Sequence, residues 1–405
     1  MSDFIKRAWL GLWLLPGMGP KSIATLVEAF GSIESLVSAD PVEINKRTGL
    51  HVNKAAEIAL APDSDATLRE LDDMARFDVD IIHFDDAHYP ALLREIDQAP
   101  PVIYHKGNLN LNDGLPIAFV GSRKASFAGK SQTKRIVKEL GETHKEIRIV
   151  SGLALGIDTS AHEAALEAGL KTIAVLAGGL SAIYPKQNIG LAHEILQAGG
   201  MLITEFPVFA APIAAHFPLR NRIISGLSRG VLVAEAGERS GTSITANYAL
   251  DQGRELFAFP GPMDSKFHIG VNRLIQRGSA KLTLCAEDIL NEINPDVAFD
   301  TTHDRKPVEI LELPIEENPL GNDSLALSDK TTQEPMEEPQ EEVSRWLHLD
   351  AKSTAVMDAL EAGPTHADGL SNKLEIPVHE LLATLTTLEM QGLINQLAGA
   401  KYNIL

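Results

Sequence analysis

The sequence predicts an α/β protein whose centre is a doubly wound, mostly parallel sheet. Three observations support this fold class. Between residues 115 and 290, short β-rich apolar runs alternate with segments of helical periodicity, which is typical of crossover units on a parallel sheet. Apolar residues make up 44% of the chain and aromatic residues only 5%, a mixture that suits layered α/β packing. The length of 405 residues exceeds what one compact core usually holds, so we expect more than one domain.

Residues 1–75 are expected to form a small all-α domain, because glycine and proline separate short helical patterns. The expected helices are Phe4–Leu15, Pro20–Phe30, Ser32–Ser38, Pro41–Thr48 and Val52–Ala59. The turn at residues 15–22 reads Leu-Pro-Gly-Met-Gly-Pro-Lys-Ser, as in a helix-hairpin-helix or SAM-like head. Its glycines would let backbone N–H groups approach a phosphate. A plain turn between two helices explains the same residues, so both interpretations stay open.

Residues 76–295 are expected to form the core of the protein. Seven apolar runs have the length of buried strands. They are Ile117–Gly121, Arg148–Gly152, Lys171–Gly178, Met201–Phe206, Val231–Ala236, Glu255–Pro260 and Lys281–Leu284. Because crossovers between parallel strands are right-handed, the intervening helical segments should cover both faces in a Rossmann-like layer.

Periodicity disappears over residues 296–345, where prolines, acids, serines and threonines accumulate. Such a segment cannot bury enough apolar area to offset its ordering entropy, so we interpret it as a flexible acidic linker. Residues 346–405 then follow the order of a winged helix. The expected elements are helices near Lys352–Glu361, His366–Leu374 and Pro377–Met390, and a hairpin of Leu393–Leu397 and Lys401–Leu405. The candidate recognition helix at 377–390 carries two glutamates and no lysine or arginine, which favours partner binding or regulation over duplex recognition.

The formal net charge of −19 argues against nucleic acid if it is taken as an average, because phosphates need a positive surface. The average misleads, since residues 296–345 carry a net −10 and leave −9 on the other 355 residues. A local basic cleft is compatible with that distribution. The acidic linker could itself compete for such a cleft as a DNA mimic.

A reducing, cytoplasmic setting is expected from cysteine usage and from the N-terminus. The single cysteine, Cys285, provides neither a disulfide framework nor a cysteine-based metal site. The apolar run after Lys6 and Arg7 stops at Pro16 without a cleavage site for a signal peptidase. No segment approaches the roughly 18 apolar residues of a membrane span, so we expect no membrane association.

The residues directly after each expected strand are candidate site residues, because ligands of open α/β sheets bind beyond the carboxyl ends of the strands. Glycines there permit close backbone approach, helix N-termini offer N–H groups, and arginine or lysine supplies charge-assisted bonds to phosphate. The candidate phosphate-binding residues are Gly121, Ser122, Arg123, Lys124, Ser151, Gly152, Lys186, Asn188, Arg220, Asn221, Arg222, Ser240 and Gly241.

Familiar cofactor motifs fit this rim poorly, so we expect no cofactor. Residues 129–131 read Gly-Lys-Ser like the end of a Walker loop, but the glycine required five positions earlier is Lys124, which argues against ATP hydrolysis. The turn with Gly152 and Gly156 lacks the Gly-x-Gly-x-x-Gly spacing, and no acidic residue ends the following strand to bind a ribose.

Four acidic or histidine side chains near strand ends are interpreted as structural. Asp158 and His162 lie one helical turn apart, but a metal site needs a third ligand, so we expect them to brace the turn or touch a phosphate. Glu205 and Glu235 are expected to orient neighbouring arginines rather than to perform catalysis.

A series of motifs in the core resembles the DNA-processing protein A family (DprA, also called Smf). The motifs are Gly-Ser-Arg at 121–123, Ser-Gly-Leu-Ala-x-Gly-Ile-Asp-x-x-Ala-His at 151–162, Tyr-Pro-Lys-x-Asn at 184–188, Phe-Pro-x-Arg-Asn-Arg-Ile-Ile-Ser-Gly-Leu at 217–227, Glu-Ala-x-x-x-Ser-Gly at 235–241 and Phe-Ala-x-Pro-Gly at 257–261. The resemblance spans about residues 85–290. The helical head and the winged-helix tail also occur in many members of the family.

The resemblance implies a protein that is not an enzyme. It binds single-stranded DNA without cutting it, forms a homodimer through its core and hands the strand to the recombinase RecA. Family DNA contacts correspond to Arg123 and Lys186, whereas Arg220 and Arg222 come from the position of the rim. The family's dimer and RecA surface corresponds to residues 272–281. Where many members carry a lysine or arginine, this chain has Leu155, which predicts lower DNA affinity or DNA contacts shared with the terminal domains.

An enzyme of the phosphoribohydrolase type is the main alternative. Residues 240–242, Ser-Gly-Thr, are similar to the Gly-Gly-x-Gly-Thr turn of those enzymes. Those enzymes place a catalytic glutamate just after that turn, whereas residues 243–248 contain no acid. A sensor of a free nucleotide stays open as well, because the same phosphate-binding turns would serve it.

Overall fold

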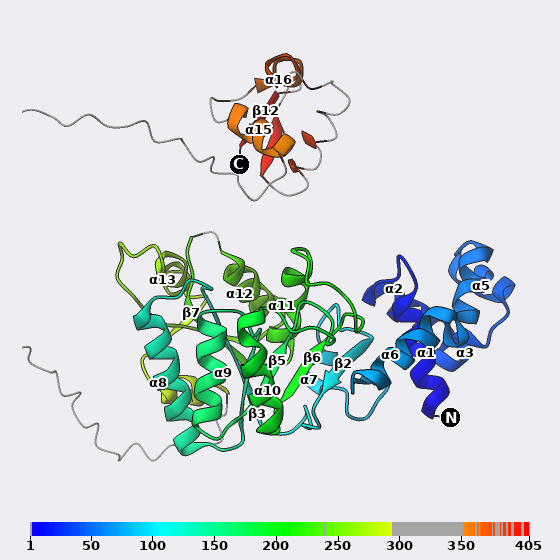
Figure 1. Cartoon of the computed structure of the whole chain (residues 1–405), viewed down its shortest axis with the longest axis horizontal. Coiled ribbons are helices and arrows are strands. Elements are labelled where there is room, and N and C mark those ends of the chain that lie inside the picture. Colours follow the sequence, from blue (N-terminus) through cyan, green and yellow to red (C-terminus); the bar gives the residue numbers. More distant parts are fainter. Residues whose placement is uncertain are drawn as a thin grey trace, which may run out of the picture. The chain divides into compact units, whose positions relative to one another are not determined.

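The computed structural model describes residues 2–238, residues 240–293 and separate stretches between 351 and 404 (Figure 1). The chain divides into two compact units, residues 1–307 and 308–405, and each is described by itself. The expected acidic linker at 296–345 lies outside the described residues. Within the described part of the chain, no helix is both long and apolar enough to span a bilayer.

The first unit begins with an all-α head, as predicted. Its helices are α1 (Ser2–Leu14), α2 (Pro20–Phe30), α3 (Ile33–Val37), α4 (Pro41–Thr48), α5 (Val52–Leu60), the short 3₁₀ helix η1 (Ala61–Asp63) and α6 (Asp65–Arg76). The expected turn joins α1 to α2, with Gly17 at a φ of +77°, a left-handed conformation that favours glycine. Helix α6 was not expected, and Ser64 caps it by accepting the N–H of Thr67.

The core is a nine-stranded sheet of order β1-β2-β6-β5-β4-β3-β7-β8-β9. Its strands are β1 (Asp80–His83), β2 (Val102–Lys106), β3 (Leu115–Gly121), β4 (Ile147–Ser151), β5 (Lys171–Val175), β6 (Met201–Thr204), β7 (Gly230–Glu235), β8 (Glu255–Ala258) and β9 (Lys281–Leu282). The seven expected strands are present and pair in parallel, although several end earlier than expected. Two further strands, β1 and β2, extend one edge with antiparallel pairing.

Helices cover both faces of this sheet, which confirms the doubly wound arrangement (Figure 1). On one face lie α8 (Phe127–Thr143), α9 (Ile157–Glu167), α10 (Ile189–Gln197) and α14 (Ala286–Ile293). On the other lie α7 (Ala91–Arg94), α11 (His216–Gly226), α12 (Gly241–Asp251) and α13 (Ile269–Gln276). Alternate residues of each strand face the two layers: Ile117 and Phe119 of β3 pack on the first face, whereas Ala118 and Val120 pack on the second.

The order of the parallel strands reverses between β3 and β7. Strands β4, β5 and β6 continue from β3 in one direction, and β7, β8 and β9 continue in the other. The loops after β3 and β7 therefore leave the sheet toward opposite faces and open a crevice between them, which is the topological switch point where such sheets bind ligands.

The second unit contains α15 (Ala351–Leu360), β10 (Thr365–His366), α16 (Ala367–Leu374), β11 (Ile394–Leu397) and β12 (Lys401–Ile404). Its sheet has the order β10-β12-β11, so the expected hairpin is present and β10 adds a short third strand. Val356, Leu370, Leu385 and Tyr402 belong to a separate small core. Much of the expected helix at 377–390 lies outside the described residues.

Candidate nucleic-acid interface

A cleft of about 440 Å³ lies at the switch point. Its walls come from the loop after β3, the loop after β4, the first turns of α11 and the start of α12. Of the thirteen expected site residues, seven line it: Gly121, Ser122, Arg123, Arg220, Asn221, Ser240 and Gly241. The chain thus brings together residues that are up to 120 positions apart in the sequence.

The loop after β3 is held close to the start of α9. A Cβ at Gly121 would lie 2.5 Å from the Ile157 side chain, and a Cβ at Gly156 would lie 2.2 Å from the Ser122 carbonyl oxygen. Both positions therefore require glycine for close approach, as expected for a ligand-binding turn. The Ser122 hydroxyl accepts the N–H of Lys124 at 3.1 Å, which leaves the side chains of Arg123 and Lys124 pointing to solvent.

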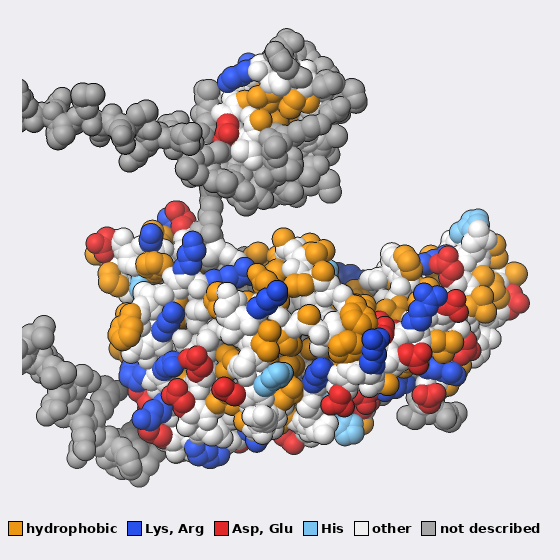
Figure 2. Space-filling model, in the orientation of Figure 1, with side chains coloured by type: hydrophobic (Ala, Val, Ile, Leu, Met, Phe, Trp, Pro, Cys, Tyr) orange, Lys and Arg blue, Asp and Glu red, His pale blue; other side chains and the backbone are white. Residues whose placement is uncertain are grey.

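Arg123 lies beside an apolar pocket. Its guanidinium carbon is 4.7 Å from the centre of the Phe217 ring, and Tyr184 meets Phe217 edge-on at 5.9 Å. The same pocket includes Gly152 and Leu155. Figure 2 shows hydrophobic side chains gathered around the loops next to α11, and Leu155 and Tyr184 are 40% and 48% exposed. The pocket therefore offers an aromatic wall beside a positive charge.

Asp158 braces the turn after β4, as expected. Its carboxylate accepts the N–H groups of Gly152 at 3.1 Å and Ala154 at 3.3 Å. Burial raises the pKa of Asp158, and the nearby Arg220 charge opposes that shift. His162 is fully buried with its Nδ1 atom 2.7 Å from the Thr172 hydroxyl, and burial lowers its pKa to about 3.

Arg220 lines the cleft but is almost completely buried beneath its surface. It is 4% exposed, and its Nη1 atom donates to the carbonyl oxygens of Gly152, at 2.7 Å, and Val175. Burial lowers its pKa to about 10. A Cβ at Gly152 would overlap the Arg220 guanidinium, so only glycine at this position leaves room for the Arg220 side chain. Arg220 supports the floor of the site by its charge and its hydrogen bonds to the turn.

Arg222 does not fit the role expected for it. It is 4% exposed, and its Nη2 atom donates to the Glu205 carboxylate at 2.6 Å. The pair is buried from solvent on both sides, so Arg222 is not available to a phosphate. Glu205 orients this arginine, as the sequence analysis expected.

Two more residues expected to contact phosphate, Ser151 and Asn188, point into the protein instead. Their side chains are buried, and buried polar groups need hydrogen-bond partners within the protein. The Ser151 hydroxyl donates to the Phe119 carbonyl oxygen at 2.6 Å and is fully buried. Asn188 is 5% exposed, and its amide donates to the Leu153 carbonyl oxygen and the Thr159 hydroxyl. Lys186, two residues before Asn188, is exposed at the start of η2 (Lys186–Asn188).

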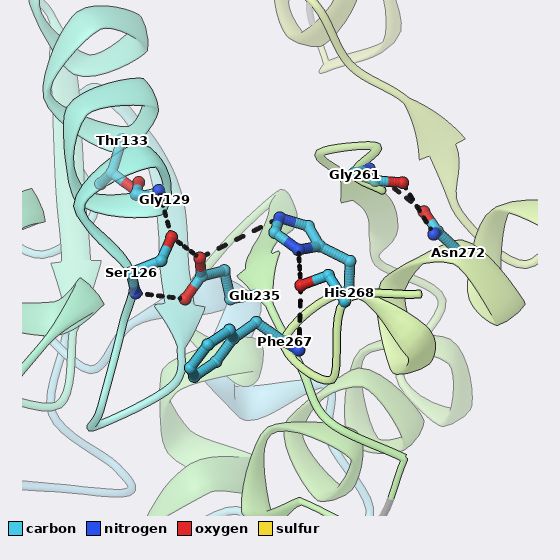
Figure 3. Close-up of polar contacts among 9 residues, drawn as sticks. Ser126, Gly129, Thr133, Glu235, Gly261, Phe267, His268 and Asn272 are labelled. Carbon is cyan, nitrogen blue, oxygen red and sulfur yellow. Dashed lines mark hydrogen bonds and ion pairs between the residues drawn. The ribbon is translucent and has the colours of Figure 1, made fainter. Parts of the chain in front are cut away.

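Glu235 was expected to orient an arginine, but it orients a serine instead. Its fully buried carboxylate accepts the Ser126 N–H at 3.0 Å and also the Ser126 hydroxyl. Figure 3 shows Ser126 and His268 on opposite sides of this carboxylate, with the His268 Nε2 atom 4.0 Å away. A Cβ at Gly129 would lie 2.4 Å from the Glu235 carboxylate, so α8 can approach Glu235 this closely only with glycine at position 129.

Ser126 also caps α8, since its hydroxyl accepts the N–H of Gly129 at 3.0 Å. The cap lies three residues after Arg123, so Glu235 fixes one end of the Gly-Ser-Arg loop to the end of β7. On the far side of Glu235, His268 bonds Ser265, and Asn272 forms two hydrogen bonds with Gly261 (Figure 3). A serine before a helical pattern is an N-cap signal that the sequence contained.

Two known protein families match this chain. The family described as "DNA recombination-mediator protein A" matches residues 80–294, and the family described as "DprA winged helix domain" matches residues 335–400. "Protein Smf" of Synechocystis sp. is 31% identical over 416 aligned residues, which cover 99% of each chain.

The chain belongs to the DprA/Smf family. The resemblance identified from the rim motifs is thereby confirmed. "DNA processing protein DprA" of Streptococcus pneumoniae is 44% identical over 51% of this chain and 72% of that protein. Its X-ray structure superposes with a TM-score of 0.61 at 34% identity, covering 72% of this chain and 96% of that one. Within the DprA/Smf core, residues 240–248 form the start of α12 and contain no acidic side chain, which disfavours the phosphoribohydrolase alternative.

Proposed function

We propose that the switch-point cleft binds single-stranded DNA. The single observation that carries this proposal is the exposed Arg123 guanidinium stacked on Phe217 at the mouth of an apolar pocket. An unpaired base has an exposed π-face that stacks on aromatic side chains, and its phosphate needs a nearby cation. A duplex keeps its bases stacked inside, so it would leave this pocket unused.

The proposed phosphate contacts are Arg123 and Lys186, which are exposed, with Ser122 and the start of α12 as hydrogen-bonding partners. Helix α12 has no acidic residue in its first turn, so its N-terminal dipole attracts an anion. Arg220 and Asp158 hold the floor of the site. The role that we propose is binding without catalysis, since the Asp158 carboxylate is engaged by the backbone N–H groups of the turn that it braces.

We further propose that the bound strand is delivered to RecA during recombination or transformation, in the cytoplasm, and that the protein acts as a homodimer through its core. Membership of the DprA/Smf family supports this proposal. The segment at 261–272, held by the Asn272–Gly261 pair, borders the residues at which the dimer and RecA surface is expected.

The double variant Arg123→Ala/Lys186→Ala tests the site. Each lost phosphate contact should flatten the slope of log affinity against log salt by about 0.7, and hence by about 1.4 for the pair. Fluorescence anisotropy of a labelled single strand at several salt concentrations measures the slope. Lys46→Ala/Lys171→Ala is the matched control, because it removes the same charge from the head and from the opposite end of the sheet. An unchanged affinity and slope in the first variant would contradict the site.

A further inference from the structure

A second groove of about 620 Å³ adjoins the cleft between α8 and α9. Arg123 and Leu155 line both this groove and the apolar pocket, and Arg123 also lines the switch-point cleft. Arg123 therefore stands at the junction of three hollows. A ligand that follows the surface past Arg123 enters the groove between α8 and α9.

The groove combines an aromatic ring, hydroxyl groups and lysines. Phe127 is 90% exposed at the start of α8, although burial of a phenylalanine side chain lowers the free energy of the folded state. Ser131 and Thr159 line the groove with Lys130. Lys138 lies two turns further along α8, in a neighbouring hollow that shares Ser131 with the groove. A ring with a free face and nearby cations is the chemistry that recognises an unpaired nucleotide.

The basic residues of α8 follow a helical row. Lys130, Lys134 and Lys138 recur every four residues, so they lie on one side of the helix with a rise of about 6 Å between neighbours. An extended single strand can match such a row with its successive phosphates. Figure 2 shows basic side chains interspersed with acidic ones over α8 and α9, on a chain whose total charge is −19.

The ends of this row differ from its middle. Lys134 pairs with Glu163 at 2.8 Å and with Glu167 at 3.6 Å, and these carboxylates raise its pKa. Lys130 and Lys138 are exposed and form no ion pair with any residue in the described ranges. Phosphates should therefore contact Lys130 and Lys138. The charge of Lys134, between them, is already compensated by the two glutamates.

We propose that a single strand leaving the cleft continues past Arg123 along the α8–α9 groove, where Phe127 stacks on one base and Lys130 and Lys138 hold phosphates. This inference rests on the proposed function, because it extends the same binding site. It assigns the groove to single-stranded DNA, since a duplex would hide the base face that Phe127 needs.

The test compares short and long oligothymidylates, from about 4 to about 16 nucleotides, the range of site size in single-strand binding folds. In Phe127→Ala/Lys130→Ala/Lys138→Ala, the shortest strands should bind as in the wild type, because they fit in the cleft alone. Long strands should bind more weakly, with a log–log salt slope shallower by about 1.4. The single variant Phe127→Ala measures the loss of stacking alone, which should weaken the binding of long strands about five-fold to a hundred-fold.

The control variant is Leu60→Ala/Lys46→Ala/Lys171→Ala, which removes one exposed apolar side chain and two charges away from the groove. It should bind long strands like the wild type. If the groove variant matches this control at every length, the groove is not part of the path and the inference is wrong. Equal weakening at every length would also overturn it, because the defect would then lie in the cleft.

A spectroscopic readout gives a second test with a folded reporter. Phe127→Trp places an indole at the exposed position, and its emission should be quenched by long strands but not by strands that fill the cleft alone. Unquenched emission on saturation with a long strand would contradict stacking at this position. Failure of the groove proposal can be distinguished from failure of the proposed function. If Arg123→Ala/Lys186→Ala loses all single-strand binding while the Phe127→Trp emission does not respond to a long strand, the groove proposal alone is wrong. If the wild type binds no single strand, both proposals are wrong.

Discussion

At the scale of residues, arginines of the same rim have opposite roles because of the direction in which each side chain points. Arg123 is exposed over Phe217, whereas Arg220 and Arg222 are buried against backbone oxygens and Glu205. The burial of a charge costs several kcal/mol unless it is paired, so these two arginines are committed to the fold. The basic residues left for a ligand are the exposed ones.

Buried His162 predicts a pH dependence of stability. Its pKa is about 3 in the folded protein and about 6.5 when exposed, so the unfolded chain binds the extra proton between these values. The free energy of unfolding should therefore decrease as pH falls below about 6.5, by about 1.4 kcal/mol per pH unit from this group. His162→Asn keeps an amide donor toward Thr172 and should remove that part of the slope.

Chemical denaturation of the wild type and His162→Asn between about pH 4 and pH 7 measures the difference. The comparison is needed because burial raises the pKa values of Asp158 and Glu205, and those groups act in the opposite direction. Parallel pH profiles for the two proteins would contradict the assignment of a neutral buried imidazole.

The sequence could predict which residues meet at the rim but not which of them face the ligand. Residues 217–227 carry one of the motifs that led to the family, yet the pattern of α11 has no strong apolar face to orient its arginines. Ser151 and Asn188 likewise stand at strand and helix ends that do belong to the rim, and only tertiary packing turns them inward. Side-chain direction at such positions depends on contacts with residues far away in the sequence.

At the scale of elements, strands β3 to β8 were predictable because each is a short apolar run that is largely buried, whereas both residues of the edge strand β9 are exposed. Strands β1 and β2 were missed since β1 has a charged first residue and a histidine at its end, and β2 follows two prolines. Both pair antiparallel at the edge of the sheet, where the apolar pattern is weaker. Helix α6 was missed because its pattern is dominated by charged residues.

The cap of α8 is predicted to matter for binding as well as for stability. Ser126→Ala removes the acceptor for Gly129 and one donor to Glu235, so it should destabilise the protein by about 1 to 2 kcal/mol. Because the cap follows the Gly-Ser-Arg loop directly, single-strand affinity should fall too.

Ser64→Ala provides a matched control, since Ser64 caps α6 in the head by the same bond to the third helical residue. It should cost similar stability without changing DNA affinity. Denaturant unfolding and anisotropy on both variants separate the two effects. Equal affinities in the two variants would show that the cap supports the fold alone.

At the scale of the whole molecule, the average charge hides the arrangement of charges. The chain carries −19, but the rim of the core presents Arg123, Lys124 and Lys186 to solvent beside apolar surface. The head is joined to the same unit, since the Trp13 indole donates to the Glu205 carbonyl oxygen at 2.7 Å and Glu70 accepts the Val208 N–H. The head thus packs at the carboxyl end of β6, next to the rim.

An anisotropy titration of the full chain at two salt concentrations tests whether the protein binds single-stranded DNA in preference to other ligands. The ligands are a single-stranded oligonucleotide, its duplex form and a panel of free nucleotides. We predict tight, salt-sensitive binding to the single strand, weaker binding to the duplex and none to mononucleotides. Tight binding of a mononucleotide without affinity for the strand would contradict it and would favour a nucleotide sensor.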